Sequence, residues 1–276
     1  MSLYITLVNN VKTFNNTMSD FKTRLGKTVV LTGQWYVGIS EITYTKSWYN
    51  VLNDYTITLF DEMGNIYGDT NIINGNPHIL KAGYYETPKK LIDELNNLFS
   101  SFEKIKAPPK LIYNDINNFL TLNVGYVEDG IKCFPDLGEE LENLLGLRNR
   151  KKNTNYYEIT NSMANIVFNG IENKDKIQAY HPVEISAGLH SMYMYSDVVY
   201  PSLVGDTFAP LLRVIEIPRK HKFGETIHIT YQSPQYRPVR LNEFETIEIS
   251  IKDDSGIEIP FKFGRVTVTL HFVNKI

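Results

Sequence analysis

The sequence predicts a mainly β protein: an antiparallel β-sandwich of the single jelly-roll type, with two short packing helices and long inserted loops. Apolar and polar residues alternate along successive runs near the C-terminus, as strands with one buried face require. Tyrosine, which suits pleated and half-buried surfaces, occurs 18 times in 276 residues. Helical periodicity is confined to two segments, and the jelly roll is the sandwich that best accommodates long insertions between strands.

The clearest strands lie between residues 244 and 272. Alternation is expected in three strands, with a DDSG turn after the first, Pro260 at an edge or bulge of the second, and a bulge or tight turn at Gly264 before the third. The inward-facing residues are Ile247, Ile249 and Ile251, then Ile257, Ile259, Phe261 and Phe263, then Val266, Val268, Leu270 and Phe272.

Earlier strands are predicted from shorter runs rich in β-branched and aromatic residues. Met63, Gly64 and Asn65 separate two such runs, which indicates a hairpin. The predicted runs are 3–8, 28–33, 34–44, 54–68, 190–200, 211–217 and 225–232.

Two helices interrupt the strands. The first, in 86–102, has Thr87 as its N-cap and Pro88 at its first position, and the second, in 136–147, ends at Gly146. Each has one apolar stripe, which predicts packing over a sheet: Leu91, Leu95, Leu98 and Phe99 in the first, and Leu137, Leu141, Leu144 and Leu145 in the second.

We expect a single domain over residues 1–276, with a polar loop excursion at about 148–176 that carries a strand at 165–170. The lone cysteine, Cys133, predicts a buried or half-buried thiol and no internal disulfide. The N-terminus has no signal-peptide pattern, and no run of about 18 apolar residues predicts a membrane span. We therefore expect synthesis in a host-cell cytosol without secretion.

The sequence carries no recognisable catalytic constellation. The six histidines show no metal-ligand spacing, and His228 and His271 occupy outward, solvated strand positions. The acidic clusters fit turns, and the phosphate-loop and nucleophile-elbow patterns are missing. We therefore predict no catalytic, cofactor-binding or metal-binding residues, no cofactor, and a protein that is not an enzyme.

Two basic runs are candidate contacts for a polyanion or a partner protein. The net charge of −3 gives the whole chain no attraction to nucleic acid, and direct nucleic-acid binding is not expected. The candidate residues are Arg148, Arg150, Lys151 and Lys152 in the first run, and Arg219, Lys220 and Lys222 in the second.

Four blocks of the sequence resemble the penton (minor capsid) protein of Polinton (Maverick) elements and adintovirus-like viruses. They are the opening from LYITLVNN to SWYNV, the helical segments YYETPKKLIDELNNLF and LENLLGL, the block MYMYSDVVYPSLVGDTFAPLLRVIEI, and the block from PQYRPVRLNEF to TLHF. The resemblance implies a single jelly roll that forms homopentamers at the icosahedral vertices of a virion capsid. It also implies a double-jelly-roll major capsid protein as partner, and no catalytic residues.

These observations predict a viral structural protein, a minor capsid protein of the penton type. The alternative is a vertex or surface attachment protein that binds a host receptor or glycan through its tyrosine-rich loops. A β-sandwich carbohydrate-active enzyme would need two carboxylates about 5–10 Å apart in a groove, and no pair in the sequence stands out.

Overall fold

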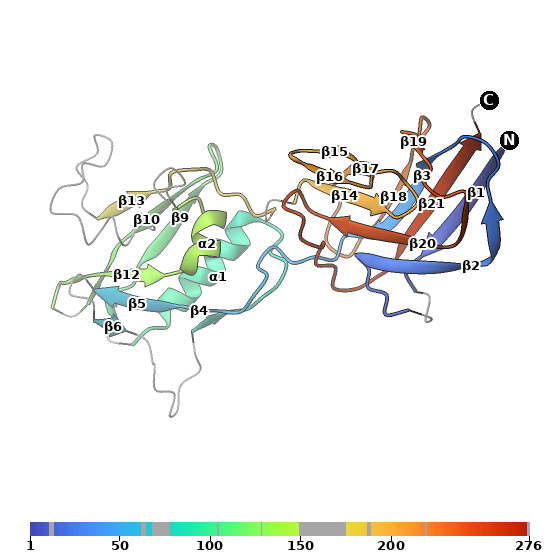
Figure 1. Cartoon of the computed structure of the whole chain (residues 1–276). Helices are drawn as coiled ribbons and strands as arrows, with labels where there is room; N and C mark the ends of the chain where they lie inside the picture. Colours follow the sequence, from blue (N-terminus) through green and yellow to red (C-terminus); the bar gives the residue numbers. More distant parts are fainter. Residues whose placement is uncertain are drawn as a thin grey trace. The chain divides into compact units, whose positions relative to one another are not determined.

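The computed structural model describes residues 1–10, 14–61, 65–67, 78–103, 105–127, 129–148, 175–186, 189–218 and 220–274. The chain folds as two compact units (Figure 1): unit 1 contains Met1–Tyr49 and Leu189–Ile276, and unit 2 contains Asn50–Gly188. The sequence predicted one domain over residues 1–276. In the structure, the apolar side chains of the inserted segment pack into a core of their own.

Unit 1 is built from strands alone in its described residues. These are β1 (Ser2–Val8), β2 (Asp20–Val30), β3 (Trp35–Thr45), β14 (Ser191–Ser196), β15 (Ser202–Val204), β16 (Thr207–Ala209), β17 (Leu211–Glu216), β18 (Thr226–Thr230), β19 (Arg237–Pro238), β20 (Glu243–Lys252) and β21 (Val266–Asn274).

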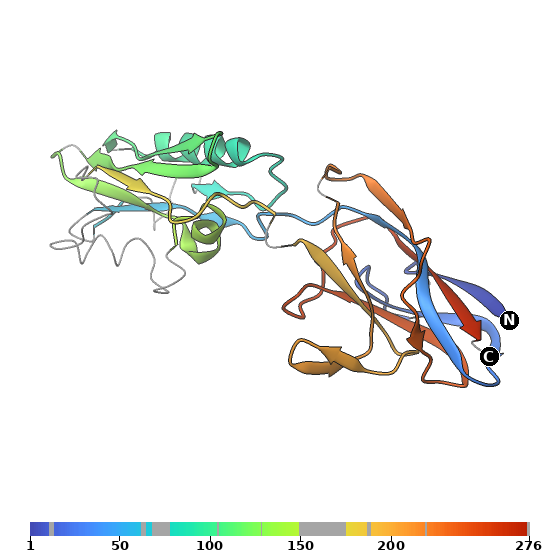
Figure 2. The ribbon, with the colours of Figure 1, turned by 90° about the horizontal axis from the view of Figure 1, so that it is seen from above.

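The strands of unit 1 form two four-stranded antiparallel layers. One has the order β1-β21-β3-β18, with β19 also paired to β3, and the other has the order β17-β14-β20-β2. If these eight main strands are numbered in chain order, the two sheets read 1-8-3-6 and 5-4-7-2, which is jelly-roll topology. Unit 2 is inserted between the third and fourth of these strands (Figure 2). The predicted fold class is confirmed.

The core of unit 1 lies between its two sheets. The inward residues of β20 and β21 are fully buried, so the alternation predicted for both strands is confirmed. Leu270 and Phe272 of β21 sit opposite Ile39 and Val37 of β3, and all four are 0 % exposed. Each such side chain stabilises the fold by about 1.5–3 kcal/mol through burial.

The strand predicted at 257–263 does not form. This segment is a loop joined to β20 by a single bridge from Glu258 to Lys252, and only Ile259 of its apolar set is fully buried. Pro260 cannot donate to a ladder, and the chain turns there, since the N–H of Phe261 donates to the carbonyl of Ile259 at 2.8 Å. Alternation alone did not distinguish this loop from a strand.

Unit 2 combines short strands with two helices. They are β4 (Tyr55–Thr56), β5 (Thr58–Asp61), β6 (Ile66–Tyr67), β7 (Ile79–Leu80), α1 (Pro88–Ser100), β8 (Ile105–Ala107), β9 (Lys110–Asn114), β10 (Phe119–Asn123), β11 (Gly125–Val127), β12 (Lys132–Asp136), α2 (Gly138–Leu144) and β13 (Lys176–Gln178). The sheet orders are β13-β10-β9, β6-β5-β12-β11-β8 and β4-β7. The predicted pairing of β5 with β6 is confirmed, and the predicted strand at 165–170 lies outside the described residues.

Helix α1 begins and packs as its sequence predicts. The Thr87 hydroxyl accepts the N–H of Lys90 at 3.2 Å and caps the helix, with Pro88 in its first turn. Leu91, Leu95 and Phe99 are 0 % exposed. The Asn96 side chain bonds both backbone groups of Leu111 at 2.8 and 2.9 Å, which fixes the helix beside β9.

Helix α2 ends where the sequence predicts. Gly146 has φ +74°, and a side chain there would overlap the backbone of His181, so a glycine is required. Leu141 and Leu145 of the predicted stripe are fully buried.

Candidate functional site

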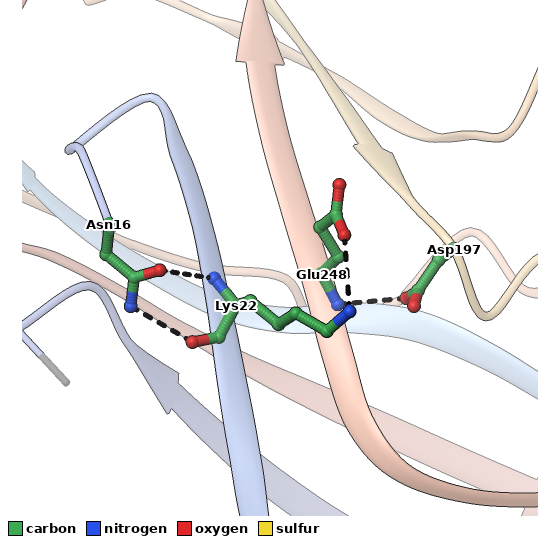
Figure 3. A network of polar contacts seen from close by, with 4 residues as sticks. All are labelled: Asn16, Lys22, Asp197 and Glu248. Atoms are coloured by element: carbon green, nitrogen blue, oxygen red, sulfur yellow. Dashed lines mark hydrogen bonds and ion pairs between the residues drawn. The ribbon is translucent and has the colours of Figure 1, made fainter. Parts of the chain in front are cut away.

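The base of the loop after β14 is held by a polar network (Figure 3). The Asp197 carboxylate accepts the backbone N–H of Glu248 in β20 at 2.9 Å, and the Glu248 side chain lies 3.8 Å from the Lys22 ammonium of β2. Asn16 bonds both backbone groups of Lys22 at 2.9 and 3.0 Å. Burial raises the pKa of Asp197, opposed by the Glu248 N–H and by Lys22 and Arg240. The network joins β2 and β20 to the loops that carry Asn16 and Asp197, and its role is to hold these segments together.

A short hairpin, β15–β16, rises from this anchored base. Leu203 pairs with Phe208 across it, and their side chains are 66 % and 75 % exposed. Gly205, with φ +59°, forms the turn. The hairpin is a two-stranded sheet that pairs with no third strand among the described residues.

The chain that leads into the hairpin is firmly held. Val198 and Val199 are 0 % exposed, and Val199 bridges Val239. The Ser196 N–H donates to the Pro210 carbonyl at 3.1 Å, which closes the loop at the point where β17 begins. Unit 1 therefore holds the two ends of the exposed hairpin, and sequence reasoning did not identify the hairpin. The signal available was the Gly205-Asp206 pair between two short apolar runs.

A second exposed surface lies at β1. The Tyr4 ring is 64 % exposed and stacks on His271 of β21, with ring centroids 4.2 Å apart and an interplanar angle of 3°. The Tyr236 hydroxyl lies 2.9 Å from His271 Nδ1. Burial by these neighbours lowers the pKa of His271. His271 does face outward as predicted, but aromatic neighbours cover it, so the prediction that it is solvated is only partly right.

His228 of β18 also faces outward, and it bonds the hydroxyls of Thr43 and Thr230 at 2.8 and 3.1 Å. In the part of the chain that the structure describes, no group of three or more His, Cys, Asp or Glu residues is placed to hold a metal ion.

Of the candidate residues in the first basic run, the structure describes Arg148 alone. Its guanidinium lies 3.1 Å from the Glu139 carboxylate and its side chain is 12 % exposed, so it serves unit 2 itself. Arg150, Lys151 and Lys152 lie outside the described residues. Lys220 and Lys222 of the second run are exposed on unit 1, and Arg219 is outside the described residues. Arg148 thus belongs to unit 2, whereas Lys220 and Lys222 belong to unit 1.

The second run leads into an aromatic cluster that sequence reasoning missed. Phe223 packs against Phe263 and Tyr49, with ring centroids 5.5 and 5.9 Å apart, and the Lys262 ammonium lies 5.0 Å above the Tyr49 ring. These residues come from three loops, so their distant positions in the sequence gave no local pattern.

Asp61, Cys133 and Glu142 are buried titratable groups of unit 2. Burial raises the pKa of Glu142 to about 7, with Arg148 opposing the shift and Asp136 and Glu139 adding to it. Burial also raises the pKa of the Cys133 thiol to about 11, helped by Asp61. The predicted buried thiol is confirmed, with Cys133 at 0 % exposure. Among the described helices, none is long and apolar enough to cross a membrane.

No protein-family model matches the chain. A search of curated proteins found no match either. Among solved structures, the crystal structure of the mavirus penton protein superposes with a TM-score of 0.50 over 99 % of both chains, at 10 % sequence identity. The cryo-EM structure of the Sputnik virophage gives a TM-score of 0.45 at 11 % identity, over 99 % of this chain and 97 % of the other.

The mavirus comparison establishes a common fold. It spans both units, so the jelly roll and the unit inserted into it are shared features.

Proposed function

We propose that the chain is a viral minor capsid protein of the penton type, whose five copies form a ring at each icosahedral vertex. The observation that carries the proposal is the match of fold with the mavirus penton protein over 99 % of both chains, which includes a jelly roll interrupted by an inserted unit. Four sequence blocks point the same way, because they resemble penton proteins of Polinton-type elements. In this proposal the protein has a structural role, which it performs through its contacts with other capsid proteins.

The shape of unit 1 supports ring formation. A jelly roll has two different flanks, here the edge strands β1 and β2 on one side and β18 and β17 on the other. A closed ring is built from head-to-tail contacts, in which one flank of a copy meets the other flank of the next. Five such contacts produce a ring that can fill a five-fold vertex of a virion capsid.

The partner in this proposal is a double-jelly-roll major capsid protein of the same genome, which builds the lattice around each vertex. We place the protein in the virion capsid after synthesis in the host-cell cytosol. Lys220 and Lys222 remain candidates for contact with an acidic partner surface, because both are exposed and positively charged.

The test is co-assembly of the full chain with that major capsid protein, read by cryo-EM of the particles. The proposal expects density of this chain at the vertices, in five copies, and open vertices in particles assembled without it. A chain that forms trimers and stays outside the particle shell would favour the attachment protein considered above.

A further inference from the structure

We propose that the hairpin β15–β16 is the contact arm between neighbouring copies in the ring, and that it packs against the β1–β2 flank of the next copy. This inference rests on the proposed function and identifies the surfaces that would build the ring. It starts from two groups among the exposed apolar side chains of unit 1, which belong to strands at opposite flanks of the jelly roll.

The first group is the hairpin surface, defined as Leu203 and Phe208 with Val214 of the neighbouring edge strand β17. These side chains are 66 %, 75 % and 42 % exposed. Soluble domains seldom expose large apolar residues side by side unless the surface binds something. A free two-stranded hairpin is only marginally stable in water, so this one is expected to gain from a neighbour.

The second group is the flank surface, defined as Tyr4 of β1 and Val30 of β2. They are 64 % and 67 % exposed. Strands β1 and β2 lie at the ends of their sheets and pack beside each other. The hairpin leads into β17, and β17 and β2 are the two opposite edges of one sheet. Figures 1 and 2 both show the hairpin away from β1.

Two different apolar surfaces on opposite flanks are what a head-to-tail ring needs. A contact of hairpin with hairpin would be self-complementary and would stop at a dimer, whereas hairpin against flank can continue from copy to copy and close. An aromatic side chain such as Phe208 is also a common central anchor of protein interfaces.

Charge favours the same pairing. The hairpin carries one charged residue, Asp206 at its turn, and no cation. Strand β2 carries Asp20 and three cations. Lys22 and Arg24 lie 3.8 and 3.7 Å from the carboxylates of Glu248 and Glu245, so the exposed Lys27 is the cation offered to Asp206 of the next copy. Opposite charges at the rim of an interface guide association and suppress the wrong pairing of hairpin with hairpin.

The test compares native masses of the full chain in four forms over a range of concentrations. They are the wild type, Leu203→Ser with Phe208→Ser, Tyr4→Ser with Val30→Ser, and Ile116→Ser as the matched control. Ile116 is 95 % exposed and lies in the turn between β9 and β10 of unit 2, so its replacement removes an exposed apolar side chain outside both surfaces. Thermal unfolding checks that each form is folded.

We expect the ring of the hairpin variant and of the flank variant to dissociate at concentrations at least about 30-fold higher than the wild-type ring, as loss of a central anchor requires. The Ile116→Ser ring should match the wild type. A mixture of the two variants provides the sharpest result. Each pair then has one intact hairpin facing one intact flank, so the mixture should form heterodimers that grow no further.

Two outcomes would overturn the inference. If the hairpin variant forms a ring as stable as the wild-type ring, the hairpin is not the contact arm, while the proposed function stands. A wild type that forms no ring and enters no capsid vertex contradicts the proposed function and the inference together. If the wild type forms its ring only in the capsid, occupancy of vertices by the four forms replaces the native mass as the readout.

Discussion

The carboxylate of Asp197 accepts the backbone N–H of Glu248 at 2.9 Å and so joins the end of β14 to the middle of β20. Arg240 Nε donates to the backbone carbonyl of the same aspartate at 3.2 Å. Asp197 directly precedes the buried Val198 and Val199, from which the hairpin β15–β16 rises. Asp197 therefore helps to position the hairpin that is the proposed contact arm of the ring.

Replacing Asp197 with alanine should cost about 1–3 kcal/mol of unfolding free energy, because the Glu248 N–H loses its partner. Hydrogen exchange should rise in 198–210 more than elsewhere in unit 1. Asp197→Asn keeps an acceptor and removes a charge that burial disfavours, so it should be at least as stable as the wild type at pH 7. Equal loss in both variants would contradict this account of the side chain.

Gly264 tests a tight approach of backbone to side chain. It has φ +107°, and a Cβ there would overlap the Thr45 side chain, whereas Gly256, with φ +86°, has open space around its Cβ position. Gly264→Ala should therefore cost about 2–4 kcal/mol, from backbone strain and overpacking together. Gly256→Ala should cost about 1–2 kcal/mol, from strain alone. Similar losses measured by denaturant unfolding would refute the clash.

The two cores should respond separately to cavities. Leu95→Ala empties space in the unit 2 core and Ile249→Ala in the unit 1 core, and both side chains are 0 % exposed. Each should cost about 2–5 kcal/mol. Native-state hydrogen exchange should speed up in unit 2 alone for the first variant and in unit 1 alone for the second. Uniform acceleration over the whole chain would instead indicate a single cooperative domain.

Glu142 should make unit 2 less stable as the pH rises. Burial raises its pKa from 4.5 to about 7, so the folded form binds the proton more tightly than the unfolded form. The carboxyl carries no penalty below about pH 4.5, and the penalty grows through pH 4.5–7 to on the order of 3 kcal/mol. Thermal unfolding from pH 4.5 to 8 should show this decline, and Glu142→Gln should remove it. An unchanged slope in Glu142→Gln would assign the decline to other groups.

Most of the strands could be predicted from the sequence, but their distribution between two separate hydrophobic cores could not. Alternation identified β20 and β21, because a side chain's phase along a strand reports which face is buried. The same pattern failed at 257–263, since Pro260 and an exposed Ile257 break the ladder without breaking the alternation. Periodicity reports burial but not the partner surface, which is why the separate core of the inserted unit was missed.

The candidate interaction surfaces were harder to foresee. Tyr4 and Val30 are strand residues of ordinary type, and only the sheet order places them on one flank. Leu203 and Phe208 sit in three-residue strands, too short for alternation to indicate a face. The basic runs attracted notice because their charges are adjacent in sequence, yet Arg148 proved to be held within unit 2 by Glu139.

Assembly as a penton is tested most directly by the native mass of the full chain, measured alone and with the double-jelly-roll major capsid protein of its genome. A penton protein should show a five-fold mass alone, or five copies at each vertex once the lattice is present. A trimer, or a monomer that the lattice leaves in solution, would contradict assembly as a penton.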